Sequence, residues 1–240
     1  MRTVGVIPAR LASTRLPEKM LADISGRPMI VWVADGVSKS GVFDSVIVAT
    51  DSEKIASVVK QAGFESIITD TALTSGTARV AAVAKNIQAD VFVNIQGDEP
   101  IVDQKGLKTL VSAFADPSIH FGTLAFPLKN EEEQNPNCVK VVLDANNDAL
   151  YFSRSLIPFP RSREKFAPLK HVGVYAYRRD MLLKLVQLPV CPLEGIESLE
   201  QLRALYHGIK IRVLPASQES FGVDTIEDLE KVREFVAGRK

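Results

Sequence analysis

The chain has 240 residues, of which 46% are hydrophobic and 24% charged, and its 29 basic and 29 acidic side chains cancel to a formal net charge of zero. This composition is typical of a globular protein, and the absence of net positive charge argues against nucleic acid as a partner. No apolar run approaches the about 18 residues of a spanning helix, so membrane insertion is not expected. The sequence starts directly in a predicted strand rather than in a targeting segment, and we expect a cytoplasmic protein.

Apolar strands and amphipathic helices alternate through the first half of the chain. Strands are predicted at 3–8, 45–49, 65–69 and 91–95, and helices at 28–38, 52–62, 76–87 and 104–115. Such alternation predicts right-handed βαβ units and a mainly parallel sheet with helices on both faces. Ligands of these sheets bind beyond the carboxyl ends of the strands, so the loops that follow the strands are the candidate sites.

The second half of the chain is richer in strands. Strands are predicted at 121–127, 139–143, 149–153, 171–177 and 210–215, with a hairpin turn at Asn146-Asn147, and helices at 179–187, 196–206 and 225–235. No linker, repeat or low-complexity segment divides the chain. We therefore expect a single domain with an inserted β-rich portion.

The first predicted strand runs into the segment IPARLASTRLPEK, residues 7–19, which concentrates positive charge. It carries Arg10, Arg15 and Lys19 together with the hydroxyls of Ser13 and Thr14. Successive amides beyond a strand end, joined by lysine and arginine side chains, are suited to bind an anion such as a polyphosphate. The segment is neither a Walker A loop nor a G-x-G-x-x-G turn, and taken alone it is equally compatible with an ordinary basic surface loop.

Two aspartates are candidates for the opposite charge. Asp98 follows the predicted strand 91–95, after Gly97, whose small size allows a close backbone approach. A carboxylate there, facing a phosphate-binding loop, suits Mg²⁺, which is usually held by one or two carboxylates and phosphate oxygens. Asp224 precedes the last predicted helix, where helix capping is the favoured interpretation of the segment taken alone, with a capping box between Thr225 and Asp228 as an option.

Other polar segments are less specific. The stretch Thr74-Ser75-Gly76-Thr77 supplies helix-capping hydroxyls and small residues that permit contact with a flat ligand such as a nucleobase, and a simple cap is the favoured interpretation. The histidines His120, His171 and His207 lack zinc-ligand spacing, and no G-x-S-x-G motif occurs. Zinc and serine hydrolysis are therefore disfavoured.

Together these segments resemble the CMP-Kdo synthetase (3-deoxy-manno-octulosonate cytidylyltransferase) family. Kdo is an acidic eight-carbon sugar. The matching motifs, in family order, are IPARLASTRLPEK (7–19), VATD (48–51), SGT (75–77), NIQGDEP (94–100), ALYFSR (149–154), HVGVY (171–175), LEQLR (199–203) and VD (223–224). A single short motif would be weak, but this set in register extends over most of the chain.

The resemblance implies a Rossmann-like α/β/α nucleotide-diphospho-sugar transferase fold, with a mainly parallel mixed sheet and a β-rich dimerisation portion. It divides the single domain of residues 1–240 into a nucleotide-binding part (1–118), a β-rich sugar-binding and dimerisation part (about 119–180) and a returning α/β part (181–240). It also implies a homodimer that catalyses CTP + Kdo → CMP-Kdo + pyrophosphate for lipopolysaccharide biosynthesis, with Mg²⁺ as cofactor. By analogy with two-metal displacements, one ion would activate the attacking hydroxyl and another the leaving group.

The resemblance also implies roles for individual residues. It places Arg10, Ser13, Arg15 and Lys19 at the CTP phosphates, Pro8, Ala9, Ser75 and Gly76 near the cytosine, Asp98 and Asp224 at Mg²⁺, and Gln96, Arg161, His171, Tyr175, Glu200 and Gln201 around the sugar. Arg10, Lys19, Asp98 and Asp224 are the expected catalytic residues, and Asp98 also counts as a CTP contact.

Several positions depart from the family pattern: Glu18 stands where glycine is usual, Ala78 where an acidic residue is common, Leu73-Thr74 where more polar residues are expected, and Gly195 and Ser198 also differ. The exact sugar stays open, because an 8-amino analogue of Kdo or another acidic sugar would undergo the same reaction. The rival from another class is a non-catalytic nucleotide-binding protein, which the retained lysine and aspartates disfavour.

Overall fold

The computed structural model describes residues 1–13 and 15–238. Its strands are β1 Thr3–Ala9, β2 Asp23–Ile24, β3 Arg27–Pro28, β4 Ser45–Thr50, β5 Glu65–Ile68, β6 Val91–Asn94, β7 Phe121–Pro127, β8 Lys140–Leu143, β9 Ala149–Ser153, β10 Leu169–Arg178 and β11 Arg212–Pro215. Its α-helices are α1 Met29–Lys39, α2 Glu53–Gln61, α3 Gly76–Asn86, α4 Gln104–Ala113, α5 Arg179–Leu185, α6 Pro192–Glu197, α7 Leu202–Tyr206 and α8 Ile226–Ala237, and short 3₁₀ turns cover Lys19–Leu21 and Asn130–Glu132. The strand and helix limits agree with most of the predicted ranges to within two residues.

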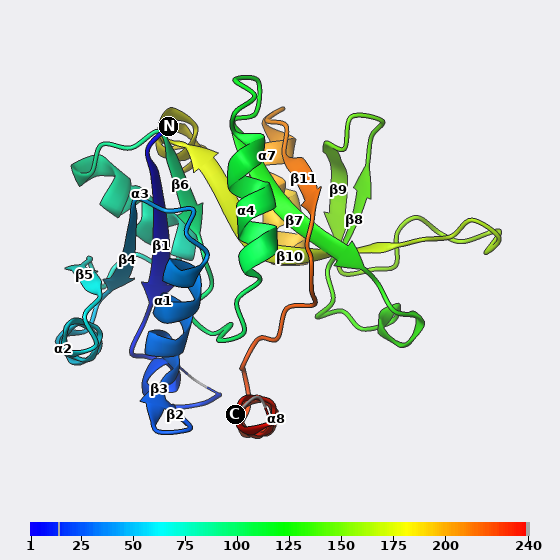
Figure 1. The fold of residues 1–240 in the computed structure, drawn as a ribbon. Coiled ribbons are helices and arrows are strands. Elements are labelled where there is room, and N and C mark those ends of the chain that lie inside the picture. The colour runs from blue at the N-terminus through cyan, green and yellow to red at the C-terminus, as the bar shows by residue number, and fades with distance from the viewer. Residues whose placement is uncertain (14, 239–240) are drawn as a thin grey trace.

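Among the described residues, one nine-stranded sheet joins the first half of the chain to the β-rich portion, and β2 and β3 form a separate two-stranded sheet. The strands of the larger sheet lie in the order β11-β7-β10-β6-β1-β4-β5, with β8 paired to β10 and β9 to β8 (Figure 1). The pairs among β6, β1, β4 and β5 are parallel, as predicted, whereas β10 runs antiparallel to β6 and β7. The sheet is therefore mixed, and the β-rich portion is continuous with the parallel half.

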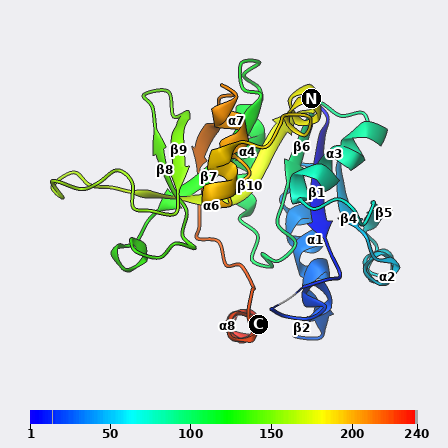
Figure 2. The ribbon, with the colours of Figure 1, turned by 180° about the vertical axis from the view of Figure 1, so that it is seen from behind.

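Helices cover both faces of this sheet, because its central strands are apolar on both sides. Along β1, Val4 and Val6 face the layer that contains α3, while Ile7 and Ala9 face the layer that contains α1. Figure 2 shows α3, α6 and α7 on the face opposite to α1 and α4. This is the predicted α/β/α arrangement, with successive side chains of a strand on opposite faces.

The predicted helix 196–206 is wrong, because the structure breaks it into α6 and α7. Ser198 lies between them with φ 51° and ψ 49°, in the left-handed region that cannot continue a right-handed helix. The amphipathic pattern predicted helical character but not the turn within it. The small hairpin of β2 and β3 was also not predicted, although Ser25-Gly26 at its tip has the positive φ angles of a tight turn.

The last helix, α8, follows an irregular segment, residues 216–225, and lies beyond the carboxyl end of the parallel strands (Figure 1). Leu229 and Val232 on its inner face pack with Ile24 and Met29. This small cluster fixes the start of α8, and with it Asp224, over the strand ends.

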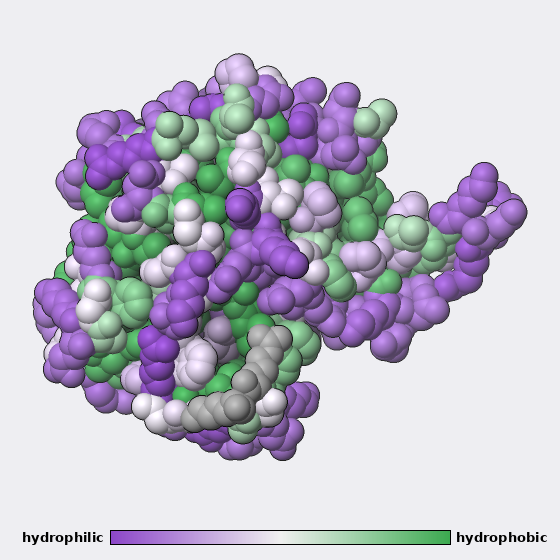
Figure 3. Space-filling model, in the orientation of Figure 1, coloured by the Kyte–Doolittle hydropathy of each residue, from purple (hydrophilic) through white to green (hydrophobic). Residues whose placement is uncertain are grey.

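The segment 154–168, between β9 and β10, projects from the sheet, and hydrophilic side chains cover its tip (Figures 1 and 3). Among the residues described, there is no helix with the length and apolar character needed to span a membrane.

Candidate active site

A pocket of about 430 Å³ opens at the carboxyl ends of β1 and β6, where the parallel sheet predicts a ligand site. The predicted residues that line it are Pro8, Arg10, Ser13, Arg15, Lys19, Ser75, Gly76, Gln96, Asp98 and Asp224. Ala9 is buried at the end of β1. Thr14 lies outside the described residues. The basic segment after β1 is thus part of a cavity rather than an ordinary surface loop.

Lys19 is the most enclosed charge among the predicted phosphate-binding residues, with 8% of its surface exposed. Its Nζ donates to Asp98 Oδ2 at 2.6 Å and to Asp224 Oδ1 at 3.0 Å. Burial by itself lowers the pKa of this lysine, but the two carboxylates outweigh it and raise the pKa above the ordinary value of 10.5. Lys19 is therefore a permanent cation between two aspartates that are far apart in sequence.

Asp224 does not cap α8, which overturns the interpretation favoured from the segment alone. Thr225 is the N-cap: its Oγ1 accepts from the Asp228 N–H, and the Asp228 carboxylate accepts from the N–H groups of Thr225 and Asp224. The predicted capping box is confirmed. Because Thr225 and Asp228 satisfy the helix end, the Asp224 carboxylate is left to bind Lys19 and, at 3.0 Å, Arg15.

Two backbone features shape the pocket beside Lys19. A Cβ at Gly97 would lie 2.9 Å from the Pro8 carbonyl oxygen and 3.1 Å from the Met20 sulfur, so the close approach predicted for this glycine is confirmed. Glu18 adopts φ 50°, the left-handed conformation that glycine takes most easily, and its carboxylate pairs with Lys54 at 2.5 Å. A glycine at this position, which the resemblance leads us to expect, would adopt this backbone conformation with less strain.

The start of α3 joins the nucleotide side of the pocket to the predicted sugar side. Ser75 caps α3 by accepting from the Ala78 N–H, and its hydroxyl donates to Glu200 Oε1 at 2.9 Å. Thr77 donates to Glu200 Oε2 at 2.6 Å. Ser75 is therefore both a cap and a pocket residue, and Glu200 contacts the segment that the resemblance places near the cytosine.

The predicted sugar-binding residues on β10 form an aromatic group next to the pocket. Gln96 Nε2 donates to the Gly173 carbonyl at 2.8 Å, and His171 Nε2 lies 3.0 Å from the Thr123 hydroxyl. The His171 ring packs 5.3 Å from the Tyr175 ring. Burial lowers the pKa of His171 to about 3 and raises that of Tyr175, so both side chains are neutral at pH 7.

Two further predicted sugar contacts have different surroundings. Arg161 is exposed on the projecting segment 154–168, and the structure does not bring it to the pocket. Gln201 is buried, and its Nε2 has no hydrogen-bond partner among the described residues.

The residue-level predictions missed Arg79, which lines the pocket, and its ion-pair partner Asp51. Arg79 is 1% exposed, lines the pocket and binds Asp51 Oδ2 at 2.6 Å. An arginine beside Val80 and Val83 on the apolar face of an amphipathic helix was the available signal, because a buried guanidinium requires partners.

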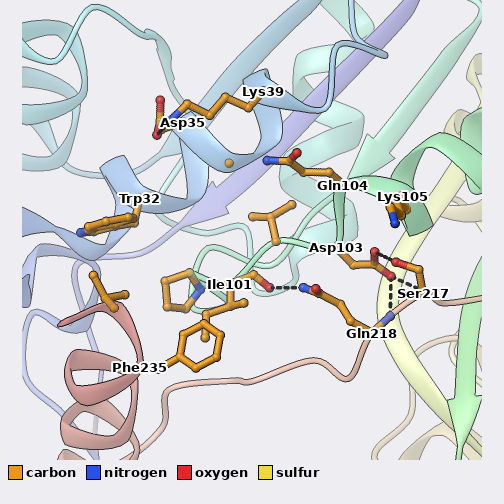
Figure 4. A pocket seen from close by; sticks show the side chains of 14 residues that line it. Trp32, Asp35, Lys39, Ile101, Asp103, Gln104, Lys105, Ser217, Gln218 and Phe235 are labelled. Carbon is orange, nitrogen blue, oxygen red and sulfur yellow. Dashed lines mark hydrogen bonds and ion pairs between the residues drawn. The ribbon is translucent and has the colours of Figure 1, made fainter. Parts of the chain in front are cut away.

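A larger hollow of about 640 Å³ lies between α1, the segment 100–105 and the last turn of α8 (Figure 4). Its carboxylates are already bonded: Asp35 pairs with basic side chains, and Asp103 accepts from backbone and hydroxyl donors. Gln104 and Lys105 at its rim are exposed. The smaller pocket, where buried charges converge, is the better candidate for chemistry despite its lower volume.

The residues of the smaller pocket fit a divalent cation shared with phosphate. Asp98 and Asp224 converge on one cation, the Lys19 ammonium, so their oxygens already face a common positively charged point. No group of three or more His, Cys, Asp or Glu that could hold a metal occurs among the described residues. Two carboxylates without further protein ligands are typical of Mg²⁺ that completes its coordination with phosphate oxygens and water.

Comparison with known proteins agrees with this pocket. The family model described as Cytidylyltransferase matches residues 4–211. The fold, the pocket and this match define the chain as a cytidylyltransferase. The 3-deoxy-manno-octulosonate cytidylyltransferases of Acidobacterium capsulatum and Myxococcus xanthus are 45% and 47% identical to it, over 100% and 99% of this chain and 98% of each relative. The chain belongs to the 3-deoxy-manno-octulosonate cytidylyltransferase family, as the motifs indicated.

Solved structures confirm the predicted fold. A structure of CMP:2-keto-3-deoxy-manno-octonic acid synthetase complexed with CTP is 43% identical and superposes over 100% of both chains, with a TM-score of 0.97. A cytidylyltransferase from Leptospira borgpetersenii, 18% identical, superposes over 99% of this chain and 87% of its own with a TM-score of 0.67 and shares the fold alone.

Proposed function

We propose that this chain transfers CMP from CTP to the anomeric hydroxyl of Kdo, forming CMP-Kdo and pyrophosphate for lipopolysaccharide biosynthesis. The observation that carries the proposal is the convergence of Asp98, Asp224 and Lys19 beside a basic loop at the end of a parallel sheet. Full-length relatives with 3-deoxy-manno-octulosonate cytidylyltransferase as their name support the nucleotide and the sugar. A cytoplasmic location is part of the proposal, because cellular CTP is cytoplasmic.

The phosphates of CTP are assigned to the basic side of the pocket. Arg10 is exposed at the pocket wall, and Arg15 and Lys19 extend from the same loop. Charge-assisted hydrogen bonds from these groups would neutralise the triphosphate and hold its α-phosphorus in place. Ser13 adds a hydroxyl donor, and Ser75 and Gly76 border the space assigned to the cytosine.

Asp98 and Asp224 are the proposed Mg²⁺ ligands. When bound, Mg²⁺ would offset phosphate charge and lower the pKa of the attacking hydroxyl. Lys19 neutralises these carboxylates in the structure, and its ammonium would be free to bind the phosphates if Asp98 and Asp224 held a divalent cation instead. This exchange would give the same lysine two roles, one before and one after the substrate enters.

In the reaction the anomeric oxygen of the sugar forms a bond to the α-phosphorus, and the bond from that phosphorus to the β-bridging oxygen breaks. The hydroxyl proton passes to solvent, and pyrophosphate leaves. Lys19 and Arg10 would stabilise charge on the phosphates, a contribution typical of phosphoryl and nucleotidyl transfer. Catalysis then consists mainly of positioning and charge stabilisation.

The sugar is assigned to the side lined by Gln96, His171, Tyr175, Glu200 and Gln201. Because His171 is neutral, it would exchange hydrogen bonds with sugar hydroxyls rather than pair as a cation with the carboxylate. Arg161 would have to approach from the projecting segment to meet the carboxylate. An 8-amino analogue of Kdo or another acidic sugar is the alternative substrate for the same chemistry.

Pyrophosphate release with CTP and a panel of acidic sugars, with and without Mg²⁺, tests the function. We expect release with Kdo only when Mg²⁺ is present, and a higher kcat/KM for Kdo than for its 8-amino analogue. If no sugar gave pyrophosphate release, the proposed enzymatic activity would be refuted. A higher kcat/KM for the 8-amino analogue than for Kdo would make the analogue the proposed substrate.

Substitution of the two aspartates tests the metal site in the same assay. Asp98→Asn and Asp224→Asn should each lower kcat/KM by at least about 100-fold while the melting temperature stays near that of the wild type. Asp116→Asn, at an exposed turn outside the pocket, is the matched control and should retain activity. Activity close to that of the wild type in both pocket variants would refute the assignment of Asp98 and Asp224 as metal ligands.

A further inference from the structure

The most buried charged side chain of the nucleotide half has no role in the proposed chemistry. Arg79, at 1% exposure, extends from α3 to the ends of β4 and β5. One terminal nitrogen donates to Thr69 Oγ1 at 2.6 Å and to the Asp70 carbonyl at 3.4 Å. The other donates to Asp51 Oδ2 at 2.6 Å and to the Leu73 carbonyl at 3.3 Å. The Arg79 guanidinium thus binds Asp51, directly after β4, and three residues of the segment 69–73 that leads to Ser75.

Asp51 extends this link to the opposite side of the pocket. Its second oxygen, Oδ1, accepts from the backbone N–H of Leu11 at 3.3 Å, within the basic loop after β1. A continuous path therefore runs from the segment 69–73 through Arg79 and Asp51 to the basic loop. The two walls that it joins are those that Ser75-Gly76 and Pro8-Arg10 form in the pocket.

The cost of burying this ion pair argues for a role beyond stability. Removing a guanidinium from water is expensive, and a well-packed apolar pair is often at least as stable as a buried ion pair. Arg79 Nε is also buried without a hydrogen-bond partner among the described residues. Unlike an apolar pair, this pair forms directional hydrogen bonds: Arg79 bonds three groups of the segment 69–73 and one on Asp51.

We propose that Arg79 and Asp51 form a clamp that fixes the distance between the two walls of the nucleotide pocket, and so sets CTP affinity and the discrimination of cytosine from uracil. The inference rests on the proposed function and deepens it. Both are positioning residues: Arg79 holds the carbonyls of the segment before Ser75, and Asp51 holds the amide of Leu11. Their loss would widen the base site while leaving Lys19, Asp98 and Asp224 in place.

The test compares Arg79→Gln, Arg79→Lys and Asp51→Asn with the wild type. Dissociation constants for CTP and UTP are measured by calorimetry without sugar, and KM and kcat by pyrophosphate release. We expect Arg79→Gln and Asp51→Asn to raise both Kd and KM for CTP at least about 10-fold and to reduce the CTP-to-UTP affinity ratio about 10-fold, with kcat within about threefold. The double variant Arg79→Gln/Asp51→Asn should be no worse than the worse single variant, because both break one link.

Arg178→Gln is the matched control, because this arginine also bonds several carbonyls but at the opposite end of the sheet. Its guanidinium donates to the carbonyls of Phe114, Asp116 and Ile119, each at 2.9 Å. The Arg178→Gln variant should have a lower melting temperature, while its CTP affinity stays within twofold of that of the wild type. Arg79→Lys keeps the positive charge but not the planar guanidinium, so we expect it to fold and to show an intermediate loss of CTP affinity. It replaces Arg79→Gln in the test if that variant does not fold.

The outcomes separate the clamp from the enzyme. Unchanged CTP affinity and base preference in the Arg79 and Asp51 variants, with only a lower melting temperature, would overturn the clamp. Wild-type protein that binds CTP but releases no pyrophosphate with any acidic sugar would overturn the proposed function, and a weaker CTP affinity of Arg79→Gln would still support the clamp.

Discussion

Lys19 shows how a single residue takes on two tasks. It lies between Asp98 and Asp224, within 3.0 Å of both, and its ammonium keeps these carboxylates from repelling each other. Asp98 and Asp224 are also the proposed Mg²⁺ ligands, so we expect the lysine and the ion to compete for them. In this structure both aspartates are therefore already paired with a cation.

Lys19→Met should separate these tasks. Without the ammonium we expect the two aspartates to bind Mn²⁺, used as a spectroscopic substitute for Mg²⁺, at least about 10-fold more tightly in the absence of nucleotide. Pyrophosphate release should fall at least about 100-fold, because one phosphate-stabilising cation is lost. Electron paramagnetic resonance titration of free Mn²⁺ measures the affinity. An unchanged or weaker Mn²⁺ affinity would show that the lysine does not compete with the metal.

His171 supplies a pH-dependent contribution to stability. Burial lowers its pKa from the ordinary value of 6.5 to about 3, so between these pH values the unfolded chain binds a proton that the folded chain does not. The stability contributed by this group is complete above pH 6.5 and is lost as the pH falls towards 3, by about 1.4 kcal/mol per pH unit.

We therefore expect the free energy of unfolding in urea to fall between pH 7 and pH 5, with about 2 kcal/mol of the loss due to His171. In His171→Gln this part of the pH dependence should disappear, whatever the variant's stability at pH 7. His207→Gln, at an exposed position, is the comparison variant. An equal pH dependence in wild type and His171→Gln would mean that the folded imidazole is not kept neutral.

At the scale of elements, the ends of helices decide which carboxylates are available. The segment GVDTIED contains three carboxylates and one hydroxyl at the start of α8, and any of several could have capped it. The structure assigns the cap to Thr225 and Asp228, and Asp224 one residue earlier points to Lys19. Helix capping by Thr225 and the contact of Asp224 with Lys19 are thus divided between adjacent residues.

This division predicts opposite effects of neighbouring substitutions. Thr225→Ala should cost about 1 kcal/mol of stability, since it leaves a donor at the helix end unsatisfied. Asp224→Asn should leave the free energy of unfolding nearly unchanged while activity is lost. Urea denaturation and pyrophosphate release measured on both variants check the pair. A larger loss of stability in Asp224→Asn than in Thr225→Ala would indicate that Asp224, not Thr225, caps α8.

At the scale of the whole molecule, the mixed sheet carries an exposed β-rich portion away from the pocket. Phe159 on the segment 154–168 is 82% exposed, and Leu150 on β9 is also exposed. Exposed large apolar side chains are candidates for a protein interface when they belong to one patch. They support the expected homodimer, with this portion as the interface.

We expect light scattering to give twice the mass of one chain. Phe159→Glu should shift this towards the monomer without lowering the melting temperature of the monomer, because it removes an apolar contact from the interface and adds a charge. Ile68→Glu, at another exposed apolar position on the far edge strand β5, is the control and should leave the mass unchanged. A monomer in the wild type would refute the dimer.

The amino-acid sequence predicted the alternation of strands and helices, because hydrophobic periodicity and helix-capping residues are local properties. It also determined the family, because motifs from Pro8 to Asp224 occur in order and need no coordinates to be recognised. Most limits of the elements followed to within two residues. The break at Ser198 did not, since an amphipathic pattern continues across a residue whose backbone leaves the helix.

Which charged side chains contact each other could be read only from the folded structure. The local sequence favours Asp224 as the helix cap, whereas in the structure Thr225 and Asp228 cap α8. The local sequence also gives Arg79 no special role, whereas its guanidinium binds both Asp51 and the segment 69–73. These pairings join segments that are distant in the chain, so no local pattern specifies them. They form because the parallel sheet brings its carboxyl ends to one edge, where buried charges must find partners.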